Sequence, residues 1–200
     1  MFNVLIDELP DTWNGYKIHT DFRNGILISQ CMEDETISDY ERFYTAAELL
    51  FQEGQDPSVD EIEEAIHWYL TEYNHDNQVK NGKKRKQTEE IPLFDFDVDQ
   101  WRVYAAFRAQ YGIDLNVADM HWFVFMGLLS NLNECALTRV MNTRAKKITS
   151  KMSPEAKQAL KDAKDRFSIK PVREKPRSPE EQAALDEFMK YANLNKEPRA

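Results

Sequence analysis

The sequence predicts a mainly α-helical protein, a helical bundle with a small N-terminal β-hairpin. Apolar residues recur at three- and four-residue spacing through much of the chain, which is the period of an amphipathic helix. Two of these stripes follow a serine and, three residues later, a glutamate, a spacing typical of a helix start. The run from Trp122 to Leu129 is apolar, with Gly127 inside it. A helix that is apolar on nearly all sides needs neighbours on several sides, so we predict that this run is the central helix of the bundle.

The N-terminal region predicts the hairpin. Residues 2–6 form a short apolar run that we predict to be a strand. Residues 16–20 alternate apolar and polar side chains, as a half-exposed strand does, and residues 13–15 (Trp-Asn-Gly) form a turn before them. The next segment is ambiguous, because Thr20 is positioned to cap a helix whereas residues 26–28 fit a strand equally well.

Two acidic helices are predicted over residues 38–51 and 58–73. Each begins with the Ser-x-x-Glu spacing of a capping box, at Ser38 and at Ser58. Their outward faces carry many carboxylates, so much of the negative charge is expected there. The residues predicted to face the core are Tyr40, Phe43, Tyr44, Ala47, Leu50 and Phe51 in the first helix and Ile62, Ala65, Ile66, Tyr69 and Tyr73 in the second.

Three further helices are predicted over residues 95–148. The first covers residues 97–111 and ends at Gly112; the central helix begins with Asn116 as cap and Asp119 in its first turn. The third covers residues 134–148. The residues predicted to face the core are Trp101, Tyr104, Ala105, Phe107 and Tyr111 in the first and Leu137, Val140, Met141 and Ile148 in the third. Short connections imply antiparallel neighbours.

These elements suggest four regions. Residues 1–73 hold the hairpin and the acidic helices, and residues 74–92 form a basic flexible linker that includes a Lys-Lys-Arg-Lys run. Residues 93–150 form the three-helix core, which we expect to pack with residues 1–73 as one domain. Residues 151–200 form a charged helical tail with few apolar side chains per turn, and we expect this tail to be mobile.

Composition narrows the function classes. The chain has 200 residues, 26 Lys and Arg against 35 Asp and Glu, and a net charge of −9, which argues against a nucleic-acid partner. The apolar run is too short for a membrane span, so we expect no membrane partner. Cys31 and Cys135 form no paired motif and are predicted to be ordinary cytosolic thiols. We expect no signal peptide, because the N-terminus lacks a basic flank.

The chemistry-bearing residues suggest a binding protein rather than an enzyme, and we expect no cofactor and no metal. His67 and His75 are eight residues apart, which does not place them on one helix face as a zinc pair would be. The alternating carboxylates from Asp95 lack the glycine and glutamate of a calcium loop. His121 is interpreted as a structural polar contact at the edge of the core. The residues predicted to bind a partner are Trp68, Tyr69, Tyr73 and Phe51.

Several stretches of the sequence resemble those of a known protein family. These stretches are Asp95-Phe96-Asp97-Val98-Asp99, Val103-Tyr104-Ala105-Ala106-Phe107, Tyr111-Gly112-Ile113-Asp114-Leu115, Met120-His121-Trp122 and the opening segment at residues 15–23. Over about residues 15 to 144, the chain resembles a family of long-tailed bacteriophage proteins that are encoded next to the tape-measure protein. Phe123 stands where a tryptophan is expected.

The resemblance implies a tail-assembly chaperone that binds the tape-measure protein and keeps it soluble during assembly of the tail tube. It implies action in the host cell cytoplasm and absence from the mature virion. The tail tube subunit and a second copy of the chain are further expected partners. We place the client groove between the two acidic helices and the central bundle. A structural tail or connector component of the virion is the alternative function.

Overall fold

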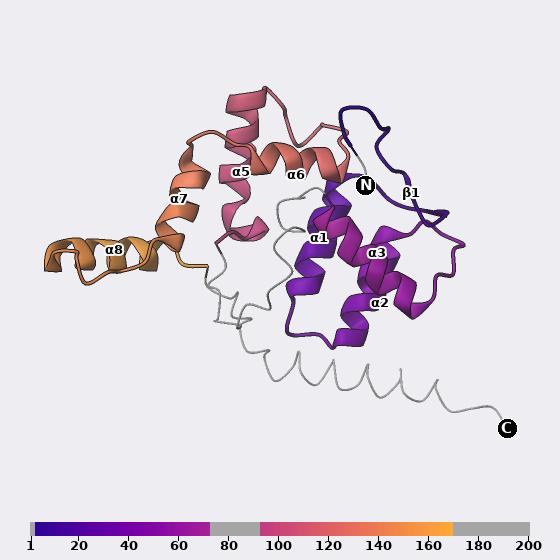
Figure 1. The fold of residues 1–200 in the computed structure, drawn as a ribbon, viewed down its shortest axis with the longest axis horizontal. Helices are drawn as coiled ribbons and strands as arrows, with labels where there is room; N and C mark the ends of the chain where they lie inside the picture. Colours follow the sequence, from indigo (N-terminus) through magenta and orange to yellow (C-terminus); the bar gives the residue numbers. More distant parts are fainter. Residues whose placement is uncertain (1–2, 73–92, 170–200) are drawn as a thin grey trace, which may run out of the picture. The chain divides into compact units, whose positions relative to one another are not determined.

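The computed structural model describes residues 3–72 and 93–169, and within them it confirms a mainly helical fold with a two-stranded antiparallel N-terminal hairpin (Figure 1). The elements are β1 (Thr12–Trp13), β2 (Tyr16–Lys17), α1 (Phe22–Glu33), α2 (Asp39–Leu50), α3 (Val59–Thr71), α5 (Phe96–Tyr111), α6 (Trp122–Ser130), α7 (Ala136–Ala145) and α8 (Pro154–Arg166). The described residues up to Phe167 belong to one compact unit.

The hairpin is shorter than predicted and uses a different first strand. Trp13 pairs with Tyr16, and the turn between them places Asn14 and Gly15 at positive φ, as a tight hairpin requires. The prediction of a strand at residues 2–6 is wrong. Residues 3–7 instead form a hydrogen-bonded turn, in which the Asp7 amide donates to the Asn3 carbonyl at 2.8 Å, and the apolar side chains between them point into solvent.

Local sequence signals specify most helix starts. Ser38 and Ser58 form complete capping boxes with Glu41 and Glu61, as predicted. The segment at residues 26–28 is helical, which resolves its ambiguity. The N-cap of its helix is Asp21 rather than Thr20, because the Asp21 carboxylate accepts the Arg23 amide at 2.8 Å.

Two predicted core stripes are rotated from the observed ones. In α2 the buried residues are Ala46 and Leu50, whereas Tyr40 and Tyr44 are exposed. In α5 the buried face runs through Asp99, Val103, Ala106 and Phe107, whereas Trp101 is 75% exposed. Both predicted stripes include bulky aromatic residues, Tyr40 and Tyr44 in α2 and Trp101 in α5, that the fold leaves at the surface.

The central helix starts later than predicted. His121 is its N-cap: the Nδ1 atom accepts the Phe123 amide at 3.0 Å, and Nε2 contacts the Pro10 carbonyl at 3.0 Å. The interpretation of His121 as a structural contact therefore holds. The cap predicted at Asn116 is wrong, because Asp114 organises that stretch into a turn by accepting the Asn116 amide at 3.1 Å.

Trp122 lies at the centre of the core. Its ring is 1% exposed, stacks on Tyr69 at 6.0 Å and on Phe125 at 5.9 Å, and donates from Nε1 to the Tyr69 carbonyl at 2.9 Å. Gly25 brings α1 against this ring so closely that a Cβ atom there would lie 2.2 Å from it. Helices α1, α3 and α6 thus meet around one indole, and α6 has neighbours on several sides as its composition requires.

A buried ion pair joins α5, α7 and the end of α8. Asp99 and Arg144 form two bonds, of 2.6 and 3.1 Å, and both side chains are buried. Arg144 also donates to the carbonyls of Leu93 (2.9 Å) and Phe167 (2.6 Å), and Arg102 contacts Asp99 at 2.8 Å. The predicted tail therefore begins with a helix that is fastened to the core.

Three predictions fall outside the described residues. They are the basic linker at residues 74–92, the partner-binding residue Tyr73 and the part of the charged helical tail after residue 169.

Candidate partner-binding grooves

The structure places the predicted partner-binding residues mostly inside the core. Tyr69 is fully buried, and its hydroxyl donates to the His19 carbonyl at 3.1 Å; burial raises the pKa of this hydroxyl well above its usual range. Phe51 is 7% exposed. Trp68 is half-buried, with its ring edge-on to Phe123 at 5.2 Å. Tyr69 and Trp68 thus stabilise the fold, and partner binding by these residues stays a prediction.

An apolar groove of about 400 Å³ lies between α1 and α5. Stacked rings make its floor: Phe125 lies 4.8 Å from Phe22 and 6.3 Å from Phe96, measured between ring centroids. Ile26 and Val103 add aliphatic surface. Because these side chains belong to the core, the floor is pre-formed and needs no rearrangement to accept a ligand.

Polar contacts hold the two ends of this α1–α5 groove. At one end, Gln30 on α1 donates to the Asp97 carboxylate on α5 at 2.8 Å. At the other end, Arg23 donates to the carbonyls of Leu115 (2.8 Å) and Ala118 (3.1 Å) and so fixes the loop before α6. The walls are therefore held at a set separation.

Trp101 is the residue that sequence reasoning missed at this groove. Its ring lines the groove, remains 75% exposed and lies edge-on to Tyr104 at 6.0 Å. Tryptophan is enriched among the residues that contribute most of the binding energy of protein interfaces. The signal was present as a tryptophan beside Gln100 and Arg102, but the 3.6-residue period alone did not tell which face of α5 was buried.

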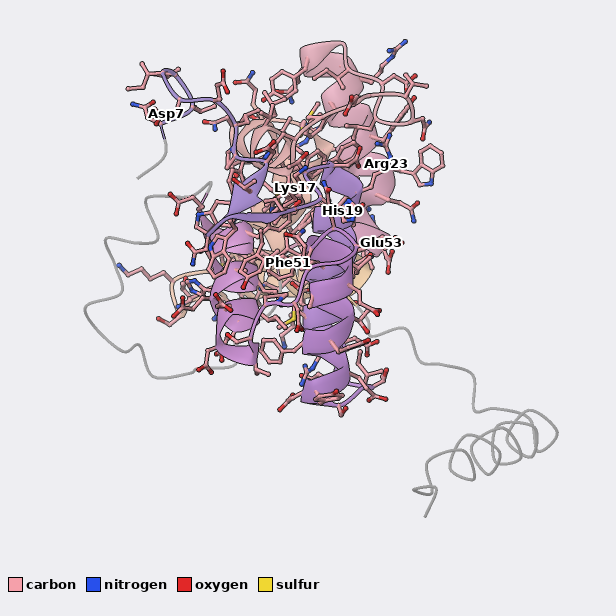
Figure 2. All side chains as sticks on the ribbon, turned by 90° about the vertical axis from the view of Figure 1, so that its right-hand side faces the viewer. Asp7, Lys17, His19, Arg23, Phe51 and Glu53 are labelled. Atoms are coloured by element: carbon pink, nitrogen blue, oxygen red, sulfur yellow. The ribbon has the colours of Figure 1, made fainter. Side chains whose placement is uncertain are left out.

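A second groove, of about 610 Å³, lies where α2 ends and α3 begins. Its apolar lining includes Ala47, Phe51 and Ile62, and Phe51 is held by an edge-on contact with Tyr16 at 5.8 Å. Figure 2 shows Phe51, His19 and Glu53 on this face of the molecule. Phe51 thus contributes to a surface hollow although little of its ring is exposed.

The loop that borders the α2–α3 groove is fastened to the hairpin. Gln55 both accepts the Lys17 amide at 2.7 Å and donates to the Lys17 carbonyl at 2.6 Å. The Gln52 amide also donates to the Lys17 carbonyl, at 3.1 Å. This groove, like the first, is held open by interactions within the fold.

The rim of the α2–α3 groove is acidic. Glu48, Glu53 and Asp56 line it, and a hydrogen bond to Glu48 raises the pKa of the Tyr44 hydroxyl. Desolvation, then Glu61 and more weakly Asp56, raise the pKa of Tyr16. Three carboxylates therefore lie at the border of this groove.

Across residues 3–72 and 93–169, no group of His, Cys, Asp and Glu side chains is arranged to hold a metal ion. In the same ranges, none of the helices has the length and apolar character required to cross a membrane.

The fold and its hollows define a class: a mainly helical protein with two pre-formed, apolar-floored grooves, one of them acidic at the rim. The model of a family described as Bacteriophage Gp15 protein matches residues 5–169, and the chain belongs to this family. The match includes the hairpin and every described helix through α8, a longer span than the resemblance noted from the sequence. No curated protein and no solved structure matched the chain.

Proposed function

We propose that this phage protein is a tail-assembly chaperone that binds the tape-measure protein and keeps it soluble while the tail tube is assembled. The observation that carries the proposal is Trp101, an exposed indole beside the apolar α1–α5 groove. On the resemblance noted above, the client is a long chain of apolar helical stripes. Such a helix can lie with its apolar face in a groove of this kind.

The α1–α5 groove suits this client better than the region between the acidic helices and the central bundle. That region is filled by the packed rings of Tyr69, Trp122 and Phe123. The α1–α5 groove instead combines a floor of aromatic rings with uncharged Gln100 and Asn116 at its border. A net charge of −9 favours solubility of the complex with an apolar client.

The proposal includes where and how the protein acts. It works in the host cytoplasm as a binding protein without catalysing a reaction, and it is absent from the mature virion. A structural tail or connector component would instead be found by mass spectrometry of purified particles. Detection there at the copy number of a tail ring would favour that alternative.

Co-expression with the tape-measure protein tests the binding site. Trp101→Ala is expected to lower the soluble fraction of the client severalfold, because anchor tryptophans commonly contribute more than about 2 kcal/mol of binding free energy. Stability should be nearly unchanged, since the ring is mostly exposed. Tyr40→Ala is the matched control, because Tyr40 is an aromatic residue of similar exposure (77%) outside this groove.

Two outcomes would contradict the proposal. In the first, the client remains as insoluble with the wild-type protein as without it. In the second, the client is rescued equally by wild type, Trp101→Ala and Tyr40→Ala, which would remove the α1–α5 groove from the binding site.

A further inference from the structure

The α2–α3 groove has carboxylates at its rim, and an apolar client would not pair with them. Its rim carboxylates Glu53 and Asp56 form no ion pair within the part of the chain that the structure describes. Its floor is apolar at Ala47, Phe51 and Ile62. The complementary ligand is a basic segment that also carries an aliphatic side chain.

The connection between α7 and α8 has this chemistry. Lys146, Lys147 and Lys151 are exposed there, and Ile148 between them is 42% exposed. The backbone leaves α7 in an extended conformation at Lys146, with φ −62° and ψ 123°. None of the three lysines takes part in an ion pair among residues 3–72 and 93–169. We call residues 146–151 the basic connection.

The two surfaces cannot meet within one molecule without unfolding it. Helix α7 packs against α5 and α8, whereas α2 packs against α1 and α3. Figure 1 shows α7 and α8 on the opposite side of α5 from α2 and α3, all within the one compact unit. A contact between the basic connection and the α2–α3 groove must therefore join two copies.

We propose that the basic connection of one copy docks in the α2–α3 groove of another. Lys146 and Lys147 then lie opposite Glu53 and Asp56, and Ile148 contacts the floor at Phe51 and Ile62. Each copy contributes a different surface to the contact, so the association is head-to-tail. Such contacts generate a closed ring if the rotation between copies closes, and a filament if it does not.

Sedimentation velocity of the full-length protein over a range of concentrations tests this inference. The wild type is expected to associate reversibly, and more weakly at high salt because the contact is partly ionic. Glu53→Lys with Asp56→Lys, and separately Lys146→Glu with Lys147→Glu, should each weaken association more than about tenfold, since both place like charges together. The chain that carries all four reversals should associate again, because opposite charges then face one another.

Two further variants separate loss of this contact from a general effect of changed charge or impaired folding. Glu63→Lys with Glu64→Lys makes the same charge change on α3 outside this groove and should leave association unchanged. Ile148→Ser removes the aliphatic contact without a charge change and should weaken association even if a charge reversal perturbs folding.

A wild type that stays monomeric at every concentration overturns the inference. So does a fourfold variant that fails to recover association while its fold is intact. Solubility of the tape-measure client is a separate measurement, so the two proposals fail independently.

Discussion

At the scale of the residue, Gly25 marks the closest approach in the core. A Cβ atom at this position would lie 2.2 Å from the Trp122 ring, and that ring is enclosed by Tyr69 and Phe125. Gly25→Ala is therefore expected to destabilise the protein by about 1–3 kcal/mol or more, because the added methyl group overpacks the core. Gly127→Ala is the matched control, since this helical glycine has nothing within 4 Å of the added carbon, and it should stabilise by about 0.5–1 kcal/mol.

Urea denaturation of both glycine variants provides the measurement. Equal effects of the two substitutions would show that helix propensity, rather than contact with Trp122, governs position 25.

Protonation of the His121 side chain is expected to make the stability of the protein depend on pH. Burial lowers the pKa of His121 in the folded protein, although its hydrogen bond to Pro10 acts in the opposite direction. The unfolded chain therefore binds a proton more readily, so the free energy of unfolding should fall as the pH drops below the unfolded value of about 6.5. His121→Asn keeps a side chain that can cap α6 but cannot titrate, and it should flatten this dependence.

Denaturation curves at about pH 7.5 and about pH 5.5 measure the effect of His121 on stability. The control is His67→Asn, at an exposed position on α3. A wild-type slope that His121→Asn leaves intact would assign the pH dependence to other groups.

At the scale of the element, the Asp99–Arg144 pair fastens α5, α7 and the end of α8. Both side chains are buried, so removing one partner leaves an uncompensated charge inside the protein. Asp99→Leu is expected to cost about 3–5 kcal/mol of stability. The double variant Asp99→Leu with Arg144→Met should recover part of this loss, because it removes both charges.

Thermal and chemical unfolding of the ion-pair variants test this role. The ion pair would not be what holds α5, α7 and the end of α8 together if Asp99→Leu costs less than about 1 kcal/mol of stability. The same would follow if the double variant is less stable than Asp99→Leu alone.

The helix starts marked by capping boxes were predictable, whereas the buried faces of α2 and α5 were not. A capping box such as that of Ser38 depends on residues three positions apart, so the local sequence contains the whole signal. The buried face of a helix depends on what packs against it. Helix α5 has aromatic or aliphatic residues on several faces, and its buried side includes Asp99, which pairs with Arg144, a residue 45 positions away. No local pattern indicates that partner.

At the scale of the whole molecule, the compact unit should fold without the residues after it. The described core is built from residues 18–160, and Phe167 provides the last carbonyl that Arg144 binds. A chain that ends after Ile169 is therefore expected to keep the unfolding midpoint of the full chain within about 2 °C. A chain that ends after Lys151 loses α8 and the Phe167 contact and should melt at a lower temperature.

Differential scanning calorimetry of both truncated chains is the measurement. Equal midpoints for the two would show that α8 adds nothing to the core, despite the burial of Leu160.

The two grooves can also be recognised only from the tertiary structure of the whole molecule. Phe22, Phe96 and Phe125 come from three elements, and the spacing within any one of them does not predict a shared floor. Likewise, Tyr69 was predicted both to face the core and to bind a partner, and it lies in the core with the Trp122 ring stacked on it. The fold class could be inferred from periodicity and composition, but the candidate sites required the tertiary arrangement.

The contrast between Trp101 and Trp122 gives the protein an intrinsic optical reporter. An indole in water emits at longer wavelength than one in an apolar environment, and these rings are 75% and 1% exposed. Of the four tryptophans, soluble quenchers should therefore extinguish the Trp101 emission first, reach the half-buried Trp13 and Trp68 less readily and leave Trp122 almost untouched. A client helix that covers the α1–α5 groove should shift the spectrum to the blue and shield it from the quencher. Trp101→Phe should abolish both changes, so occupancy of the groove can be titrated without attaching a label.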